Sequence, residues 1–328
     1  MNKSHYKSFL ATLLIMVVGL SACKRADTPA LTPITVQLLW VYDAQFAGFY
    51  AADQKGHYKA EGLAVTLAQG EPNVNSQKPV LAGEAQFGIA GADQLILAQS
   101  EGKPVRAIAT IYRHSPVVFI ALASSGITRP QEFVGKTIRV VANVIPSLRA
   151  MTTHVGIRPN QFTEVILPSD LTHFSSGKIP VWGVYLTSFV VLAKQAGYKL
   201  NIIYPDDYGV HFYADTIFAT DDFIAKNPDL VRRFLRATFK GWTYAVENPT
   251  ATASFVSKYN PDADTALETA KMISSLPLIN TGEDYIGWMK PEIWAGMGKN
   301  LREQGVLKNF LDVKQVYTLQ FLKEIYQK

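Results

Sequence analysis

The chain has 328 residues, a formal net charge of +5 and a single cysteine, Cys23. This length is sufficient for a conventional hydrophobic core, and a single cysteine excludes an intramolecular disulfide framework. The excess positive charge is small and scattered rather than gathered in a patch, which argues against a nucleic-acid partner.

The amino-terminus has the pattern of an export signal. A basic start is followed by an uncharged apolar run at residues 9–20, too short for a permanent membrane span, and small residues precede Cys23. We interpret residues 1–22 as a signal peptide and residues 23–33 as a lipidated cysteine with its tether. The alternative is an ordinary signal peptide with a stray cysteine. Both interpretations predict export, and the first also predicts anchoring to a bacterial membrane, facing the periplasm or the cell exterior.

Strand-like and helix-like periods alternate along the following part of the chain, which predicts an α/β protein with mostly parallel sheets. The predicted strands are residues 34–40, 63–68, 87–90, 105–112, 137–141, 163–167 and 200–204. The predicted helices between them are residues 45–55, 92–99, 146–155 and 187–196, and helices dominate from residue 217 onward.

Two kinds of polar pair are interpreted as structural rather than catalytic. Asn227-Pro228, Asn248-Pro249 and Asn260-Pro261 each suit a helix start, because asparagine can cap free N–H groups and proline lacks one. Asp206-Asp207 and Glu283-Asp284 have neither a base nor a nucleophile nearby in sequence, and adjacent acids do not face each other. We therefore expect turn or cap roles for both acidic pairs.

Candidate binding residues cluster where predicted strands end, the edge at which open α/β sheets hold ligands. Aromatic rings and polar side chains occur together there, as in an apolar pocket with a few orienting hydrogen bonds. Core packing is the alternative role for any single ring. The candidates are Trp40, Tyr42, Gln45, Phe46, Asp93, Tyr112, His114, Ser115, Trp182, Tyr185, Thr187, Tyr208 and His211.

The sequence gives little support for a metal or a cofactor. The histidines after the export signal include no pair at the spacing that one helix face would use for ligation. Lysine-based chemistry with a pyridoxal-type cofactor stays open through Lys55 and Lys78, although export argues against it. We therefore expect a binding protein without a cofactor, and not an enzyme.

A series of short motifs resembles bacterial solute-binding proteins of the thiamine-pyrimidine and aliphatic-sulfonate type. The run from Trp40 to Val65, with Gln45-Phe46-Ala47-Gly48-Phe49-Tyr50 at its start, is similar to the opening of these proteins. Further matching motifs follow in the same order at residues 81–88, 102–105, 135–137, 207–213 and 240–245. The resemblance covers nearly the whole chain after the export signal.

This resemblance implies a two-lobed, type II periplasmic-binding-protein fold with a hinge of two crossings. We place the crossings near Ala121 and Ala214, which makes lobe I residues 34–120 plus 216–328 and lobe II residues 121–215. Such a protein is a monomer that closes on a small molecule and delivers it to an ABC permease with its ATPase.

For the ligand, the resemblance implies a planar aminopyrimidine. Relatives of this type read Tyr-Leu-Thr-Asn-Glu-Pro where this chain has residues 185–190, Tyr-Leu-Thr-Ser-Phe-Val, so an acid that could pair with an amino group is missing. A neutral, more apolar ligand or a different pose is the resulting expectation. A small oxyanion or sulfonate held by Arg113 or Arg149 stays open, as does a larger flat vitamin such as a flavin.

Two other functions stay open from the same resemblance. Very similar domains act as ligand sensors, and a stand-alone sensor would need a separate membrane partner. Eukaryotic thiamine-pyrimidine synthases share the fold, but they carry a cysteine-rich motif that this chain lacks.

Overall fold

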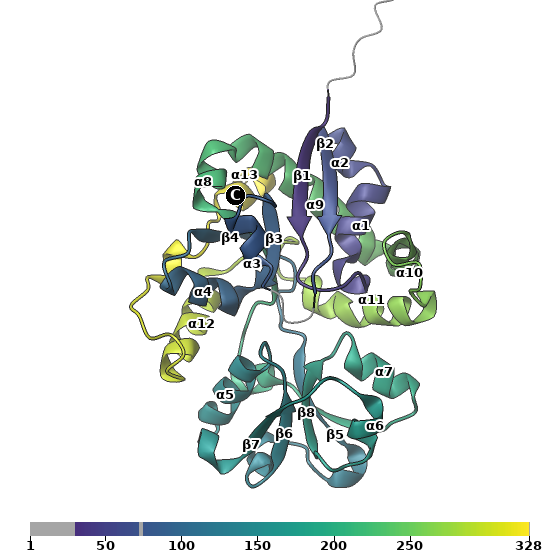
Figure 1. The fold of residues 1–328 in the computed structure, drawn as a ribbon, viewed down its shortest axis with the longest axis vertical. Coiled ribbons are helices and arrows are strands. Elements are labelled where there is room, and N and C mark those ends of the chain that lie inside the picture. The colour runs from purple at the N-terminus through teal and green to yellow at the C-terminus, as the bar shows by residue number, and fades with distance from the viewer. Residues whose placement is uncertain (1–29, 72–74, 328) are drawn as a thin grey trace, which may run out of the picture. The chain divides into compact units, whose positions relative to one another are not determined.

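The computed structural model describes residues 30–71 and 75–327. The predicted signal peptide, Cys23 and most of the tether lie outside the described residues. Residues 32–328 group into one unit by their contacts, and the fold described below is that of this unit. It contains two five-stranded sheets, each with helices on both sides (Figure 1).

The first sheet has the strand order β2-β1-β3-β10-β4. Its strands are β1 (Thr32–Gln37), β2 (Leu63–Ala68), β3 (Phe87–Gly91), β4 (Val105–Thr110) and β10 (Asp215–Thr220). The central strands β3 and β10 are almost continuously buried, because helices cover both faces of this sheet.

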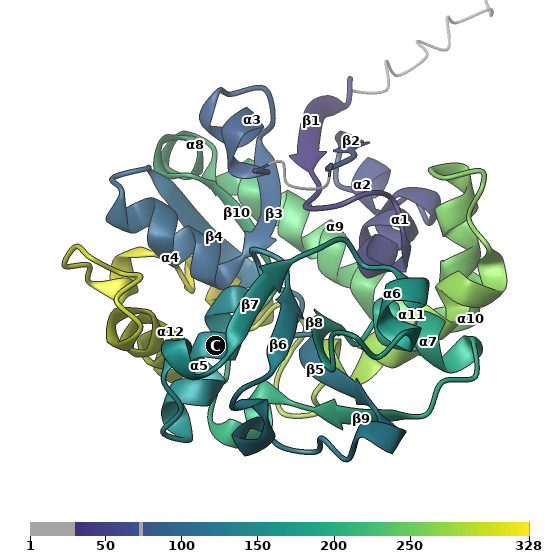
Figure 2. The ribbon, with the colours of Figure 1, turned by 60° about the horizontal axis from the view of Figure 1, so that its bottom comes forward.

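The second sheet has the strand order β7-β6-β8-β5-β9. Its strands are β5 (Val117–Leu122), β6 (Thr137–Val140), β7 (Thr163–Ile166), β8 (Val181–Tyr185) and β9 (Leu200–Ile203). Helix α5 (Ile145–His154) lies on one side of this sheet, and α6 (Leu171–Ser175) and α7 (Phe189–Gln195) lie on the other (Figures 1 and 2).

Both sheets are mixed, so the expectation of mostly parallel sheets needs correction. β10 runs antiparallel to β3 and β4, and β5 runs antiparallel to β8 and β9. The reason is the path of the chain. The chain leaves one sheet for the other after β4 and again after β9. The next strand, β5 or β10, therefore enters its sheet at the edge where the parallel strands of that sheet end, and it runs antiparallel to its neighbours.

The first crossing lies earlier than the sequence predicts. β5 pairs with β8 and β9 of the second sheet, so residues 117–120 do not belong to lobe I, and the chain crosses within residues 111–116. The second crossing occupies residues 204–214, between β9 and β10. A fully apolar strand fits the centre of either sheet, and nothing in its own residues distinguishes the two.

The remaining helices belong to the part of the chain that forms the first sheet. They are α1 (Ala47–Gln54), α2 (His57–Ala60), α3 (Gln77–Leu81), α4 (Ala92–Ser100), α8 (Asp221–Lys226), α9 (Pro228–Glu247), α10 (Pro249–Ala253), α11 (Thr265–Ile279), α12 (Pro291–Glu303) and α13 (Gln320–Tyr326). The long helix α9 packs along α1 and contacts α2 and α13.

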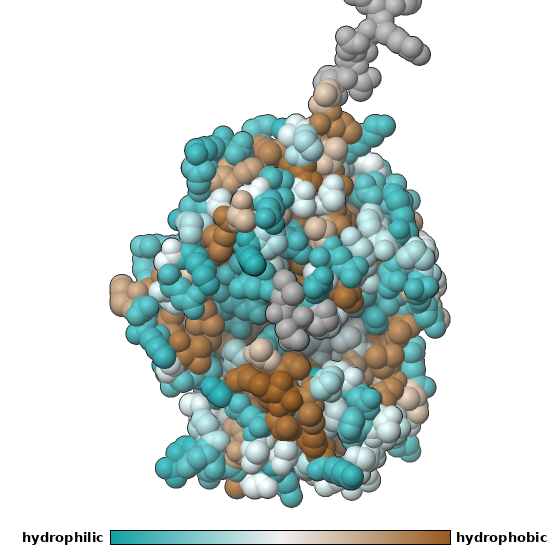
Figure 3. Space-filling view, viewed as in Figure 1, coloured by the Kyte–Doolittle hydropathy of each residue, from teal (hydrophilic) through white to brown (hydrophobic). Residues whose placement is uncertain are grey.

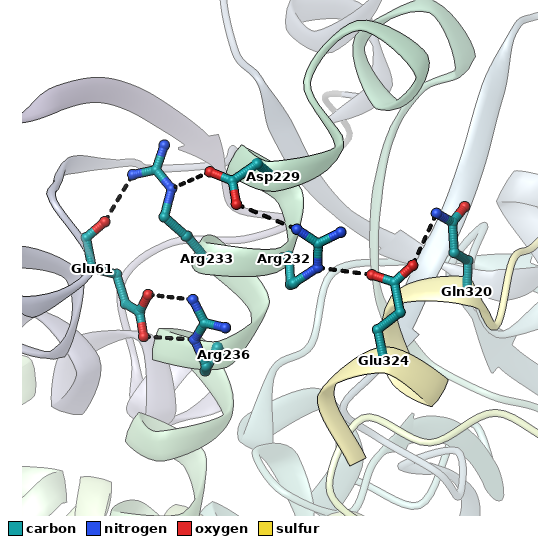
Figure 4. A network of polar contacts seen from close by, with 7 residues as sticks. All are labelled: Glu61, Asp229, Arg232, Arg233, Arg236, Gln320 and Glu324. Atoms are coloured by element: carbon teal, nitrogen blue, oxygen red, sulfur yellow. Dashed lines mark hydrogen bonds and ion pairs between the residues drawn. The ribbon is translucent and has the colours of Figure 1, made fainter. Parts of the chain in front are cut away.

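A polar network fixes α9 to its neighbours (Figure 4). Arg236 of α9 donates two hydrogen bonds of 2.7 Å to the Glu61 carboxylate between α2 and β2. Arg232, on the same helix, donates to Glu324 of α13 at 2.8 Å. These paired contacts orient α9 against elements that are distant in sequence.

The three Asn-Pro pairs behave differently from one another. α9 and α10 begin at Pro228 and Pro249 as expected, but the preceding asparagine side chains make no cap hydrogen bond; Asn227 and Asn248 instead donate to Phe223 O and Tyr244 O. No helix begins at Pro261. α11 begins four residues later, where Asp264 caps it by accepting from the N–H groups of its first turn.

Figure 3 shows a largely hydrophilic face, with apolar side chains gathered on the second lobe over β6 and β7. The edge strand β7 contributes Ile166, which is 69% exposed. Within residues 30–71 and 75–327, no helix combines the length and apolarity that a bilayer crossing needs.

Candidate functional site

A pocket lies where the carboxyl edges of the two sheets meet. It offers about 400 Å³ of space not filled by atoms, part of it open to solvent. The first lobe contributes Leu39, Gly91, Asp93, Gln94 and Asp215; the second contributes Val117, Asn143, Ser147 and Tyr185; the crossings contribute Ser115, Phe212, Tyr213 and Ala214. Both lobes and both crossings therefore line one site.

Asp215, the first residue of β10, is the most constrained polar group in this pocket. Asp215 is 3% exposed, and Gln45 Nε2 donates to its Oδ2 at 2.7 Å, while Oδ1 has no hydrogen-bond partner among the described residues. Burial raises the pKa of Asp215 to about 7, the hydrogen bond from Gln45 opposes that rise, and the charge of Asp43 adds to it.

Asp93 supplies a second carboxyl from the first turn of α4. Burial raises its pKa to about 6, although backbone N–H groups at the start of the helix hydrogen-bond to it and act in the opposite direction. Two carboxyls with raised pKa values thus line the same pocket, which is the usual sign of a functional site.

Asp43 and two residues of α11 hold the turn that carries Gln45 in place. Asp43 caps this turn by accepting from Gln45 N at 3.0 Å, and Glu268 of α11 accepts from Ala44 N at 2.6 Å. Lys271 pairs with Glu268 at 2.7 Å and with Asp43 at 3.6 Å. Helix α11 therefore positions Gln45, and through it the Asp215 carboxyl.

The second lobe presents Tyr185 and Asn143 to the pocket. Asn143 Nδ2 donates to the Tyr185 hydroxyl at 2.9 Å. Burial raises the pKa of Tyr185, and the charges of Asp215 and then Asp93 raise it further. Tyr185 of the second lobe therefore lines the same pocket as Asp93 and Asp215 of the first.

The structure brings four of the predicted binding residues together and leaves others apart. Gln45 supports the pocket, and Asp93, Ser115 and Tyr185 line it. Tyr112 is buried behind it, where burial, and next the charge of Asp215, raise the pKa of its hydroxyl.

Several predicted aromatic residues lie elsewhere. Phe46 is fully buried in the core of the first lobe, and Trp182 in that of the second, where it stacks on Phe189 and donates to Ile179 O. Tyr42 packs against Tyr50 and Tyr259 and donates to Leu67 O. Trp40 is 40% exposed, Thr187 is buried and Tyr208 is half-buried; none of the three lines the pocket.

His114 and His211 lie at the hinge. Asp206 accepts from His211 Nδ1 at 2.8 Å and lies 3.6 Å from His114 Nδ1, so one carboxylate joins the two crossings. Burial acts to raise the pKa of Asp206, but the hydrogen bonds from His114 and His211 outweigh it and lower that pKa. The hydrogen bond to Asp206 in turn raises the pKa of His114.

Both arginines considered for an anion site are already paired. Arg113 lies 3.0 Å from Asp284 and also donates to Thr281, and Arg149 forms a two-fold pair with Glu164 at 3.0 Å. Neither lines the pocket. The acidic pair at 283–284 thus serves as a partner for Arg113 rather than as a simple turn.

Sequence reasoning missed the polar residues Gln94, Asn143, Ser147 and Asp215, and its candidates did not include the rings of Phe212 and Tyr213. The two carboxyls of the pocket come from the first lobe: Asp93, which was among the predicted binding residues, and Asp215, which was not. The available signal for Asp215 was an isolated charge just before the apolar residues 217–219, a position where burial makes a carboxylate costly unless it has a role.

A second hollow lies within the second lobe, lined by Leu122, Phe174, Ile179 and neighbouring residues. No charged residue lines it, and the first lobe contributes nothing to it. It lacks the convergent polar groups of a specific ligand site.

The NMT1/THI5-like family model matches residues 43–252. The chain is 24% identical to the riboflavin-binding protein RibY of Chloroflexus aurantiacus, over 95% of this chain and 96% of that protein. It is 25% identical to a 4-amino-5-hydroxymethyl-2-methylpyrimidine phosphate synthase of Legionella pneumophila, with coverage of 89% and 92%. It is also 25% identical to the formylaminopyrimidine-binding protein of Halalkalibacterium halodurans, with coverage of 74% and 76%.

Among solved structures, the periplasmic aliphatic sulphonate-binding protein SsuA of Escherichia coli superposes with a TM-score of 0.71 at 13% identity, over 88% of this chain and 92% of that one. This similarity confirms the expected two-lobed periplasmic-binding-protein fold. At such low identity it carries no information about the ligand.

Proposed function

Since this chain belongs to the NMT1/THI5-like family, we propose that it is the extracytoplasmic solute-binding component of an ABC importer. Its ligand in this proposal is a small planar heteroaromatic such as a thiamine-precursor pyrimidine. The observation that carries the proposal is the pocket shared by both lobes, where Tyr185, Phe212 and Tyr213 supply rings and Asp93, Asp215 and Asn143 supply hydrogen-bonding groups.

The names of the relatives support a flat, nitrogen-rich ligand. One is named for binding riboflavin, one for binding formylaminopyrimidine and one for making an aminopyrimidine phosphate. A ligand that touches both lobes favours their closed arrangement only through its higher affinity for that state, and closure is what a permease would recognise.

A sulfonate or another oxyanion fits the pocket poorly. Such a ligand needs arginine or a comparable donor array, but among residues 30–71 and 75–327 no lysine, arginine or histidine lines the pocket. Two carboxyls in the same place would repel an anion.

A pyrimidine synthase is the second candidate, favoured by the name of the Legionella relative. Lys55 and Lys78 were the lysines considered for a cofactor. Both are exposed and neither lines the pocket, and Lys55 Nζ lies 4.3 Å from the centre of the Tyr244 ring. This arrangement supports the binding protein over the enzyme.

We also propose that the protein is exported and anchored through a lipid on Cys23. The test is fractionation of cells that express either the wild-type chain or Cys23→Ser. The wild type should be found in the membrane fraction and incorporate labelled fatty acid, whereas the variant should incorporate none. Equal labelling of the two proteins would contradict the anchor.

The test of the ligand class is a thermal-shift screen of the full-length protein in mild detergent. The probes are aminopyrimidines, riboflavin, alkanesulfonates and nitrate. A ligand at a hundredfold over its dissociation constant adds about 2.7 kcal/mol to the free energy of unfolding. We expect a planar heteroaromatic to raise the melting temperature. Tyr185→Ala should diminish this shift, whereas Tyr204→Ala, at an exposed position outside the pocket, should retain it. A shift with anions alone would refute the proposal.

A further inference from the structure

We infer that the ligand presents a protonated, positively charged N–H edge to Asp215, with Asp93 as the second carboxyl. Binding of a neutral base therefore carries a proton into the pocket. This inference rests on the proposed function and specifies the chemical class within it. The ligand is a basic heteroaromatic of the aminopyrimidine kind, and its phosphate ester is rejected.

The first observation is the half-satisfied carboxyl of Asp215. Asp215 lines the pocket and is 3% exposed. Gln45 donates to its Oδ2, but Oδ1 has no hydrogen-bond partner among the described residues. Buried polar atoms in native proteins nearly always have a partner. The natural partner for a carboxyl oxygen at a binding site is a donor on the ligand.

The second observation is the imbalance of charge around this carboxyl. Asp43 and Glu268 lie behind the pocket and Asp93 lines it, whereas Lys271 is the cation of this group and is already paired with Glu268 and Asp43. In the part of the chain that the structure describes, no basic residue lines the pocket itself. The other titratable neighbours of Asp215 are phenols, Tyr112 and Tyr185, which supply no positive charge.

A protonated aminopyrimidine matches both observations. Its ring N–H and the adjacent amino group form two parallel donors, one for the free Oδ1 and one for Oδ2, which can accept a second hydrogen bond beside that from Gln45. Tyr185, Phe212 and Tyr213 provide surfaces for the flat ring, and a cation near aromatic faces is further stabilised. A phosphate ester would bring negative charge toward Asp93 and Asp215.

The proton balance follows directly. Above neutral pH the free base is neutral and Asp215 is ionised, so formation of the ion pair takes one proton from the buffer onto the ring nitrogen. At lower pH, where Asp215 keeps its proton in the empty pocket, that proton passes from the carboxyl to the base and the buffer supplies none.

The experiment is isothermal titration of the full-length, detergent-solubilised protein at pH 8, in phosphate and in Tris. The probes are 4-amino-5-hydroxymethyl-2-methylpyrimidine, its phosphate ester, the pyrimidinone that lacks the amino group, and riboflavin. We expect the two buffers to give heats that differ by the uptake of about one proton for the aminopyrimidine. The ester and the pyrimidinone should bind more than tenfold more weakly.

Asp215→Asn should abolish the proton uptake and weaken binding by roughly 10- to 150-fold, the range for loss of a charged hydrogen bond. Asp207→Asn, at an exposed acid that the pocket does not use, should leave both unchanged. Circular dichroism of each variant separates lost binding from lost folding.

Two outcomes overturn the inference while the proposed function stands: buffer-independent heats for the aminopyrimidine, or binding of the pyrimidinone, ester or riboflavin with equal or higher affinity. Unchanged affinity of a folded Asp215→Asn variant would overturn it as well. The absence of heat from every planar probe would overturn the proposed function, and the inference with it.

Discussion

At the scale of single residues, burial of the ionised Asp215 carboxyl lowers the free energy of unfolding. Asp215 titrates near 7 in the folded protein because of burial, whereas an aspartate in an unfolded chain titrates near 3.8. Between these pH values the unfolded chain has lost a proton that the folded chain keeps. The free energy of unfolding therefore falls as the pH rises through this window, and the contribution levels off above pH 7.

Asp215→Asn should remove this pH-dependent loss. Near pH 3.5, below the pKa of an aspartate in the unfolded chain, the variant and the wild type should be about equally stable, because the amide has the shape of the protonated carboxyl. At pH 8 the variant should be more stable, by at most about 4 kcal/mol given 1.4 kcal/mol per pKa unit. Urea unfolding at both pH values measures the difference, with Asp207→Asn as the control. Parallel pH dependence in all three proteins would contradict the raised pKa.

Asp215 and the other site residues show which parts of the pocket could be predicted from the sequence and which could not. Asp93 and Tyr185 were predicted because they follow strands, and strand ends meet at one edge of a sheet. Trp182 was predicted by the same rule but points into the core, since alternate residues of a strand face opposite sides and the sequence alone did not identify the side. Asp215 was not found because it begins β10, a strand that the sequence analysis did not predict; helices were expected from residue 217 onward.

At the scale of elements, α1 and α9 approach so closely that only glycine fits at their contact. A Cβ atom added to Gly241 would lie 2.2 Å from Gly48 O and 2.6 Å from the Ala52 Cβ. Backbone atoms cannot move aside as a flexible side chain can, so a larger residue must push the helices apart.

Gly241→Ala should therefore destabilise the protein by about 1–3 kcal/mol, despite the higher helix propensity of alanine. Gly296→Ala in α12 is the matched control, because no atom lies within 4 Å of its added Cβ. That control should be neutral or more stable by up to about 1 kcal/mol. Urea denaturation compares the two variants. Equal effects at both glycines would show that the contact between α1 and α9 is looser than described.

Element boundaries were predictable where local chemistry decides them. Residues 63–68 form a strand as predicted, and Gly56 adopts the left-handed conformation that was expected to close the first helix. The sheet to which β5 belongs was not predictable, because that choice depends on partners more than 60 residues away in sequence. Local patterns thus gave many of the elements but not β5, β8 or β10, and β10 lies partly where helices were expected; long-range pairing assigned the strands to lobes.

At the scale of the whole two-lobed unit, contacts beside the pocket hold the lobes together. α5 of the second lobe contacts α12 of the first, and α7 contacts α11. His154 of α5 joins both sides of the hinge, since its Nε2 lies 2.9 Å from Asn300 Oδ1 and its Nδ1 lies 2.8 Å from Tyr208 O. This residue does not line the pocket.

His154→Ala should weaken ligand binding without changing the pocket. Loss of a contact made only when the lobes meet raises the free energy of the closed state by about 0.5–1 kcal/mol, which corresponds to a two- to fivefold weaker affinity. The loss should appear as faster ligand release, measured by stopped-flow fluorescence with the ligand that the thermal-shift screen identifies. His173→Ala, at an exposed histidine whose ion-pair partner is Asp170 three residues before it, is the control and should release ligand at the wild-type rate. Unchanged release from His154→Ala would mean that closure depends on the ligand and the crossings alone, and that the α5–α12 contact contributes nothing to it.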